Sequence, residues 1–229
     1  MLSVPLERAA PKVSEALRTC LSRPPLEQLE VEFRLGKKTK DTSAFDPHIS
    51  AAFWSGIKRA LESNPRWQGV MQTSTVDHIL SSNTRLTRCQ TTGDATAVRK
   101  TRVMSLDIEV PDCPLDVRLS ISTEVPMGQW PAGVQLPPSL AATASTKSLV
   151  RAKRRDSYLH NGWRFDLTRV ERAASDNADS DEAEVYEVEL EMDPMLLLKK
   201  PVDQLARHGL LLAQDLLQMV DGRHVAAPV

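Results

Sequence analysis

Charged and apolar residues alternate along several short segments of this chain, and within each segment the charged positions carry mostly one sign. Side chains two residues apart on a β-strand share one face of the strand. The charged faces predicted in this way are, in chain order, Glu30, Glu32 and Arg34; Arg118 and Glu124, with Ser120 and Ser122 between them; Arg151, Lys153 and Arg155; Arg164, Asp166 and Thr168; and Glu187, Glu189 and Glu191. The opposite faces are apolar, as in Val31, Phe33 and Leu35.

These residue types suit phosphate chemistry. Carboxylates from two strands can form an oxygen-only site for a hard divalent cation such as Mg²⁺ or Mn²⁺. Five bases suit a multiply charged phosphate chain, namely Arg118, Arg151, Lys153, Arg155 and Arg164. A metal that faces a basic wall is the arrangement that phosphoryl transfer needs, because that reaction depends mainly on positioning and charge neutralisation.

Two architectures would produce this pattern. An antiparallel sheet with a solvated polar face is the simpler one for any single strand. The sorting of acids and bases over five strands favours a sheet that curls into a barrel with its charged faces inward, although small barrels normally have apolar interiors. Such an interior requires charges that are paired, hydrated or neutralised by a ligand.

Other catalytic patterns are missing from the sequence. Gly36-Lys37 is not a P-loop, because no glycine lies five residues before Gly36. Neither the HExxH and Cys/His zinc patterns nor GxSxG occurs, and no cysteine has the arginine six positions later that a cysteine phosphatase requires.

The elements that would carry these residues follow from periodicity and turn signals. Helices are predicted at residues 5–21, at residues 46–63 with Asp46 as the N-cap, and after Asp193. The first strand is predicted at residues 28–36. Asn161-Gly162 predicts a hairpin that pairs residues 149–158 with 163–170. Residues 125–146 and 171–184 are predicted to be loops, and the second of these is strongly acidic.

Composition limits the class of protein. The 229 residues contain 30 acids and 29 bases, so the net charge of −1 gives no reason to expect non-specific binding to nucleic acid or membranes. No apolar run reaches the roughly 20 residues of a membrane span, and the first twenty residues contain no signal-peptide core. Three isolated cysteines indicate a reducing compartment. We therefore expect a soluble intracellular protein.

Four ordered segments resemble the metal-dependent mRNA-capping RNA 5′-triphosphatases of fungi and protozoa, which belong to the triphosphate tunnel metalloenzymes. Leu29–Gly36 and Tyr186–Glu191 resemble the two glutamate motifs of that family. Arg151–Glu171 resembles its paired basic and Arg-x-Asp-x-Thr strands, and Asp116–Pro126 resembles the strand between. The resemblance implies an α+β, mainly β fold: an eight-stranded antiparallel barrel, the triphosphate tunnel, with helices packed outside. Residues 1–229 would form one such domain, with its tunnel core at 28–193 and flanking helices at 1–27 and 194–229.

The resemblance also implies roles for individual residues. Glu30, Glu32 and Glu191 would be the metal ligands, Glu187 and Glu189 would orient metal-bound water or neighbouring bases, and Glu124 would position the attacking water. Lys153 and Arg155 would hold the γ-phosphate. The basic lining would be completed by Arg34, Lys100, Arg118, Arg151 and Arg164, with Asp166 and Thr168 as hydrogen-bonding supports. Asp77 and Arg88 would match an Asp and a phosphate-binding Arg of earlier strands, where Arg85 competes with Arg88.

The implied reaction is hydrolysis of the γ-phosphate from the 5′-triphosphate end of nascent RNA, with Mg²⁺ or Mn²⁺, as the first step of cap formation. Because no KxDG nucleotidyltransferase motif is present, a separate guanylyltransferase would act next. We expect a monomer, no membrane association and, from the capping role, a nuclear location. The alternatives are a tunnel-fold tripolyphosphatase or nucleoside triphosphatase, and a binding module that grips triphosphate ends without hydrolysis.

Overall fold

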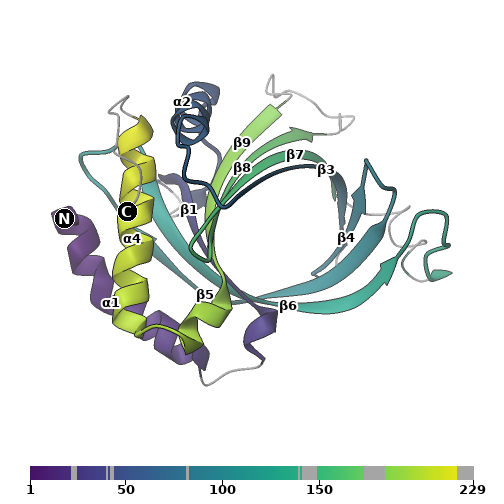
Figure 1. Cartoon of the computed structure of the whole chain (residues 1–229), viewed down its shortest axis with the longest axis horizontal. Coiled ribbons are helices and arrows are strands. Elements are labelled where there is room, and N and C mark those ends of the chain that lie inside the picture. The colour runs from purple at the N-terminus through teal and green to yellow at the C-terminus, as the bar shows by residue number, and fades with distance from the viewer. Residues whose placement is uncertain are drawn as a thin grey trace.

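The computed structural model describes residues 1–21, 25–39, 41, 44–80, 83–138, 140, 149–172 and 184–220. The elements are α1 (Val4–Leu21), η1 (Leu26–Gln28), β1 (Leu29–Lys38), β2 (Phe45–Asp46), α2 (Ala51–Glu62), β3 (Gly69–Ile79), β4 (Thr84–Cys89), β5 (Ala95–Ile108), β6 (Asp116–Trp130), β7 (Leu149–His160), β8 (Trp163–Arg172), β9 (Glu184–Met192), η2 (Pro194–Leu198) and α4 (Val202–Val220) (Figure 1). The η elements are short 3-10 helices.

The strands form a closed antiparallel barrel. Within the described ranges the order is β1-β6-β5-β4-β3-β7-β8-β9, and β9 pairs with β1 to complete eight strands. The ninth strand, β2, adds two residues to the edge of β1. The barrel with outer helices predicted from the sequence is confirmed.

On the β1–β9 side of the barrel the apolar strand faces point outward into the core, between barrel and helices. Phe33 of β1, Trp163 of β8 and Leu190 of β9 are almost fully buried there. Helix α4 approaches them closely, since a Cβ built at Gly209 would lie 2.7 Å from the Phe33 ring and 2.8 Å from the Trp163 ring. Figure 1 shows α1, α2 and α4 on the β1–β9 side of the barrel, away from β3 and β4.

The hairpin between β7 and β8 forms where Asn161-Gly162 predicts it. Both residues have positive φ values, 50° and 79°, as a two-residue hairpin turn of this kind requires. The turn sets the register that places Arg155 opposite Thr168 and Ser157 opposite Asp166. The same alternation therefore brings the charged positions of both strands to the inner face.

Two predicted boundaries are wrong. Asp46 does not cap a helix, because residues 45–46 pair with β1 as β2; α2 begins five residues later, at Ala51, where the Ser50 hydroxyl accepts from the Phe53 amide at 3.2 Å. Residues 125–130 are not loop, because β6 continues to Trp130, and a register shift opposite Pro126 accommodates the proline in the ladder. Residues 139 and 141–146 of that predicted loop, and 173–183 of the acidic one, lie outside the described residues.

None of the helices in the described ranges is long and apolar enough to cross a lipid bilayer.

Candidate active site

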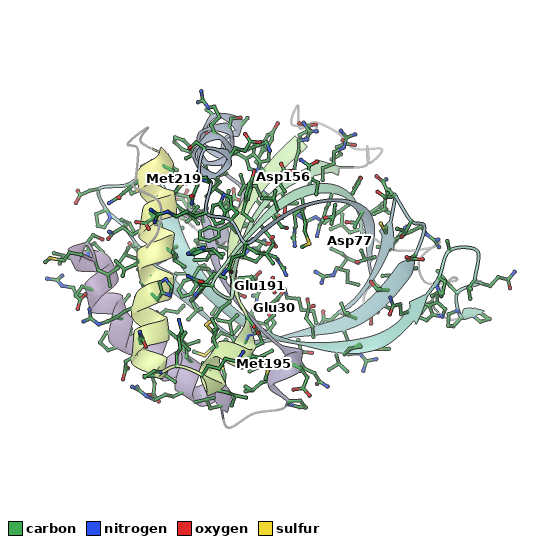
Figure 2. The ribbon with its side chains drawn as sticks, viewed as in Figure 1. Glu30, Asp77, Asp156, Glu191, Met195 and Met219 are labelled. Atoms are coloured by element: carbon green, nitrogen blue, oxygen red, sulfur yellow. The ribbon has the colours of Figure 1, made fainter. Side chains whose placement is uncertain are left out.

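The inner faces of the strands enclose a cavity of about 770 Å³. Figure 2 shows Glu30 and Glu191 on one side of the barrel interior and Asp77 on the side across from them. Twelve of the residues predicted from the sequence line this cavity: Glu30, Glu32, Arg34, Lys100, Glu124, Arg151, Lys153, Arg155, Arg164, Glu187, Glu189 and Glu191. The cavity is thus walled largely by ionic side chains, which is unusual for the inside of a small barrel.

One side of the cavity is an acid wall, formed by Glu30 and Glu32 of β1 and Glu187, Glu189 and Glu191 of β9. The strands are adjacent, with Glu32 directly opposite Glu191 and Arg34 opposite Glu189. The Arg34 guanidinium lies 2.7 Å from the Glu189 carboxylate and 3.8 Å from that of Glu187. The Arg34 guanidinium is therefore held by ion pairs with the glutamates around it.

The glutamates of the acid wall differ in how well they are compensated. Burial raises the pKa of Glu191 to about 7, and the Arg164 guanidinium offsets only part of this. Burial also raises the pKa of Glu32, with the Glu189 carboxylate adding to the rise. Although burial alone would raise the pKa of Glu189, Arg34 and Arg155 hold it well below the usual range. At Glu32 and Glu191 the neighbouring cations therefore do not offset the cost of burying a charged carboxylate, so the protonated form is favoured there.

A second side is a basic wall, formed by Arg151, Lys153 and Arg155 of β7, which β8 separates from β9. Each base contacts a carboxylate: Arg151 lies 2.7 Å from Glu187, Lys153 lies 2.6 Å from Asp77, and Arg155 lies 2.9 Å from Asp166 and 3.1 Å from Glu189. These contacts connect the basic wall to the acid wall through β8 and β9.

Asp166 is the buried centre of the basic side. It is fully inaccessible to solvent and accepts hydrogen bonds from Arg155 at 2.9 Å, Arg164 at 3.0 Å and the Ser157 hydroxyl at 2.6 Å. Thr168, also buried, accepts from Arg155 Nε at 2.9 Å. Both side chains hold arginines in place rather than lining the cavity.

The third side of the cavity, formed by β4, β5 and β6, also contains ion pairs between basic residues and glutamates. Lys100 forms an ion pair with Glu30 and lies 3.7 Å from Glu124, the residue across from it on β6. Arg85 of β4 lies 2.9 Å from the same Glu124 carboxylate. Glu124 is thereby held between two cations at the cavity surface.

The structure does not bring Arg88 and Arg118 into the cavity. Arg88 alternates with Thr87, whose hydroxyl donates to Asp77, so Arg88 lies on the outer face and donates to the Gly93 carbonyl at 3.1 Å. The phosphate contact predicted for Arg88 is therefore corrected in favour of Arg85, which lines the cavity. Arg118 lies beyond one end of the lining, where it donates to Asp107 at 2.5 Å and stacks 4.6 Å from the centre of the Phe45 ring.

One residue near the site had no signal in the sequence pattern. His48 Nε2 lies 3.8 Å from Glu187, and its Nδ1 lies 3.0 Å from Asp46. It reaches the barrel because Ile49 bridges to Tyr186 of β9. Since this contact joins residues far apart in the chain, neither strand periodicity nor local spacing could have predicted it.

Comparison with known proteins assigns this tunnel to a family. The family model described as "mRNA capping enzyme, beta chain" matches residues 39–209, most of the chain. The chain belongs to this family. Among curated relatives it is similar to the mRNA-capping enzyme subunit beta of Yarrowia lipolytica, with 32% identity over 139 residues. That match covers 60% of this chain and 30% of the relative, so the chain spans less than a third of the length of this capping subunit.

Solved structures of capping triphosphatases share the fold. The Pct1 RNA triphosphatase of S. pombe matches with a TM-score of 0.67 and 19% identity, covering 96% of this chain and 94% of that one. The mimivirus capping enzyme triphosphatase matches with a TM-score of 0.58 and 16% identity, covering 92% and 96%. At these identities the similarity establishes the tunnel fold, which this capping-enzyme chain shares with them.

Proposed function

We propose that this chain is a divalent-metal-dependent RNA 5′-triphosphatase, which hydrolyses the γ-phosphate of triphosphate-ended RNA to leave a diphosphate end. The observation that carries the proposal is the cavity inside the closed barrel, which is lined by a carboxylate wall on β1 and β9 and a wall of bases on β7. Membership of the capping-enzyme family supports RNA as the substrate.

A metal fits the donor set of the acid wall. Glu30, Glu32 and Glu191 offer carboxylate oxygens from neighbouring strand positions, and oxygen donors suit Mg²⁺ and Mn²⁺. In the part of the chain that the structure describes, no three acidic, histidine or cysteine side chains form a ready-made metal cluster, because Lys100 and Arg164 contact these glutamates. Burial, with neighbouring carboxylates adding to its effect, raises the pKa values of Glu32 and Glu191, and a bound divalent cation would act in the opposite direction. A bound cation would neutralise phosphate charge at this wall.

The chain's own residues would bind and orient the substrate. Lys153 and Arg155 hold the γ-phosphate, since their charged ends line the cavity and are fixed by Asp77 and Asp166. Burial, with the neighbouring Arg151 and Arg155, lowers the pKa of Lys153 in spite of Asp77. Added phosphate charge next to Lys153 would therefore favour its protonated form.

Glu124 would orient the attacking water. Its carboxylate reaches the cavity and is held by Arg85 at 2.9 Å and by Lys100 at 3.7 Å. Charge that develops on the leaving β-phosphate would be stabilised by Arg85 and Arg151, both of which line the cavity. Catalysis would thus come from positioning and charge compensation.

A small-substrate role is the second candidate, and one observation favours it. No aromatic side chain lines the cavity within the described residues, so the site offers no platform on which a base would stack. A tripolyphosphatase or nucleoside triphosphatase would need only the phosphate-binding part of the same cavity.

The deciding experiment measures phosphate release from γ-labelled triphosphate-ended RNA with Mg²⁺, beside tripolyphosphate and ATP. Wild type is compared with Glu30→Gln and with Glu109→Gln, an exposed glutamate paired with Lys38 away from the tunnel. We expect Glu30→Gln to lose RNA turnover by at least about 100-fold and Glu109→Gln to retain it. Turnover of tripolyphosphate alone would establish the second candidate instead. Tight triphosphate binding without turnover of any substrate would indicate a binding module.

The remaining assignments extend the proposal. Residues 1–229 would act as one tunnel domain, as a monomer. A separate guanylyltransferase would cap the diphosphate end that it leaves. Both steps would take place in the nucleus, where nascent RNA is made.

A further inference from the structure

Lys100 occupies the space between glutamates that the metal site would need. Its ammonium forms an ion pair with Glu30, and lies 4.0 Å from the Glu32 carboxylate and 3.7 Å from that of Glu124. Two of these three carboxylates are proposed metal ligands. The Lys100 side chain is only 32% exposed, so water does little to screen these interactions.

The other cations of the acid wall are held differently. Arg164 contacts Glu191, but its Nε also donates to both oxygens of the buried Asp166 at 3.0 Å. Arg34 is fixed by Glu189 at 2.7 Å. Lysine is a point charge on a flexible four-carbon stem, whereas arginine presents a rigid fork. Lys100 is therefore the cation best able to leave its carboxylates without breaking another anchored contact.

We propose that Lys100 is an internal counter-ion that competes with the divalent cation for Glu30 and Glu32. It compensates these carboxylates in the metal-free protein and gives them up when the metal binds, keeping Glu124 as its neighbour. Lys100 acts here as a positioning residue for the metal ligands, and the proposal rests on the metal site described under the proposed function.

Removing a residue from an active site usually weakens ligand binding, but the proposal predicts the opposite effect on metal affinity. Loss of the Lys100 charge should strengthen metal binding, because the metal no longer has to displace a competing cation. Two cations about 4 Å apart repel strongly in a partly buried site, so we expect a gain of at least about tenfold in affinity.

Mn²⁺ binding, measured by calorimetric titration without substrate, tests this directly. Wild type is compared with Lys100→Gln and with Lys153→Gln, a matched loss of charge at a cavity lysine whose partner is Asp77. Lys153→Gln reports the general effect of removing a positive charge from the tunnel. Lys100→Gln should tighten Mn²⁺ binding well beyond that effect, whereas Lys100→Arg, which keeps the charge, should not tighten it.

Thermal unfolding provides a second readout that is independent of turnover. Metal-free Lys100→Gln should melt below wild type, because Glu30 and Glu32 lose their counter-ion, and Mn²⁺ should raise its Tm by more than it raises that of wild type. If wild type binds Mn²⁺ but Lys100→Gln gains no more than Lys153→Gln does, the counter-ion proposal is wrong and the metal site stands. If neither wild type nor Lys100→Gln binds Mn²⁺, the metal site and the counter-ion proposal both fall.

Discussion

The two main walls of the tunnel carry charges of opposite sign and are compensated to different degrees. On the basic wall each base has a carboxylate within 3 Å, and Asp77 and Asp166 are buried for that purpose. Within the described part of the chain, the five glutamates of the acid wall share five lysine and arginine cations, and three of these cations also contact carboxylates outside the wall. Burial leaves Glu32 and Glu191 with raised pKa values. The side chains of the basic wall are thus already paired, whereas Glu32 and Glu191 of the acid wall would be stabilised in their charged form by a bound cation.

This contrast explains how a barrel with a charged interior can be stable. Buried ions are costly when unpaired, but a connected network repays much of that cost. In this barrel the apolar packing lies outside, under α1, α2 and α4, so the interior does not have to supply the hydrophobic core. The interior charges are therefore available for binding and chemistry.

The largest expected difference between the walls is in stability. Asp166→Ala should lower the free energy of unfolding by about 3–5 kcal/mol, because it removes the buried carboxylate that Arg155, Arg164 and the Ser157 hydroxyl share. Glu191→Gln should lower it by no more than about 0.5 kcal/mol, or raise it, because it removes an under-compensated carboxylate. Urea unfolding of the metal-free proteins at pH 7.5 measures both changes. Equal losses for the two variants would contradict the contrast between the walls.

A second comparison separates two arginines on one strand. Arg85→Ala should reduce kcat/KM by about 100-fold, because Arg85 reaches the cavity and holds Glu124. Arg88→Ala should change it less than twofold, since that side chain lies on the outer face. Steady-state kinetics on triphosphate-ended RNA distinguishes them, with circular dichroism as the check on folding. A larger drop in kcat/KM for Arg88→Ala than for Arg85→Ala would contradict the assignment of Arg85 to the inner face of β4.

The smallest effect concerns pH. The pKa of Glu191 rises from 4.5 to about 7 in the folded protein, so between these values the folded state binds more protons than the unfolded state. The metal-free protein should therefore lose stability as pH rises from 5 to 7, by about 1–2 kcal/mol. Asp77 acts in the opposite sense, because its lowered pKa contributes stability that is lost only at more acidic pH. Thermal unfolding across this range tests the slope. Glu191→Gln should reduce it, and the raised pKa of Glu32 should account for a remaining slope of the same sign.

Strand parity carries much of the information that predicts the tunnel. It was enough to bring Glu30, Glu32 and the β9 glutamates to one inner face, and the Asn161-Gly162 turn correctly joined β7 to β8. Parity also separates the two arginines of β4. Arg88 shares its face with the buried Leu86, whereas Arg85 shares its face with Thr87. The prediction for Arg88 rests on the family resemblance and not on this alternation.

Long-range contacts account for the other differences. Asp46 has the features of a helix cap, yet it pairs with Lys37 of β1 instead. Arg118 has the expected parity, but its height along the barrel takes it to Asp107 and Phe45 rather than to the cavity. Parity specifies the face of a strand on which a side chain lies, whereas its depth in the tunnel depends on how all the strands are staggered.

The pairing of β1 with β9 has a consequence for the order of assembly. The residues of this seam, Val31–Arg34 and Glu189–Met192, come from opposite ends of the barrel sequence, so closing it requires a loop of most of the chain. During synthesis the basic wall on β7 leaves the ribosome before β9 does. The proposed metal ligands thus come together only when the barrel closes, so a metal would bind at this site only after β9 has paired with β1.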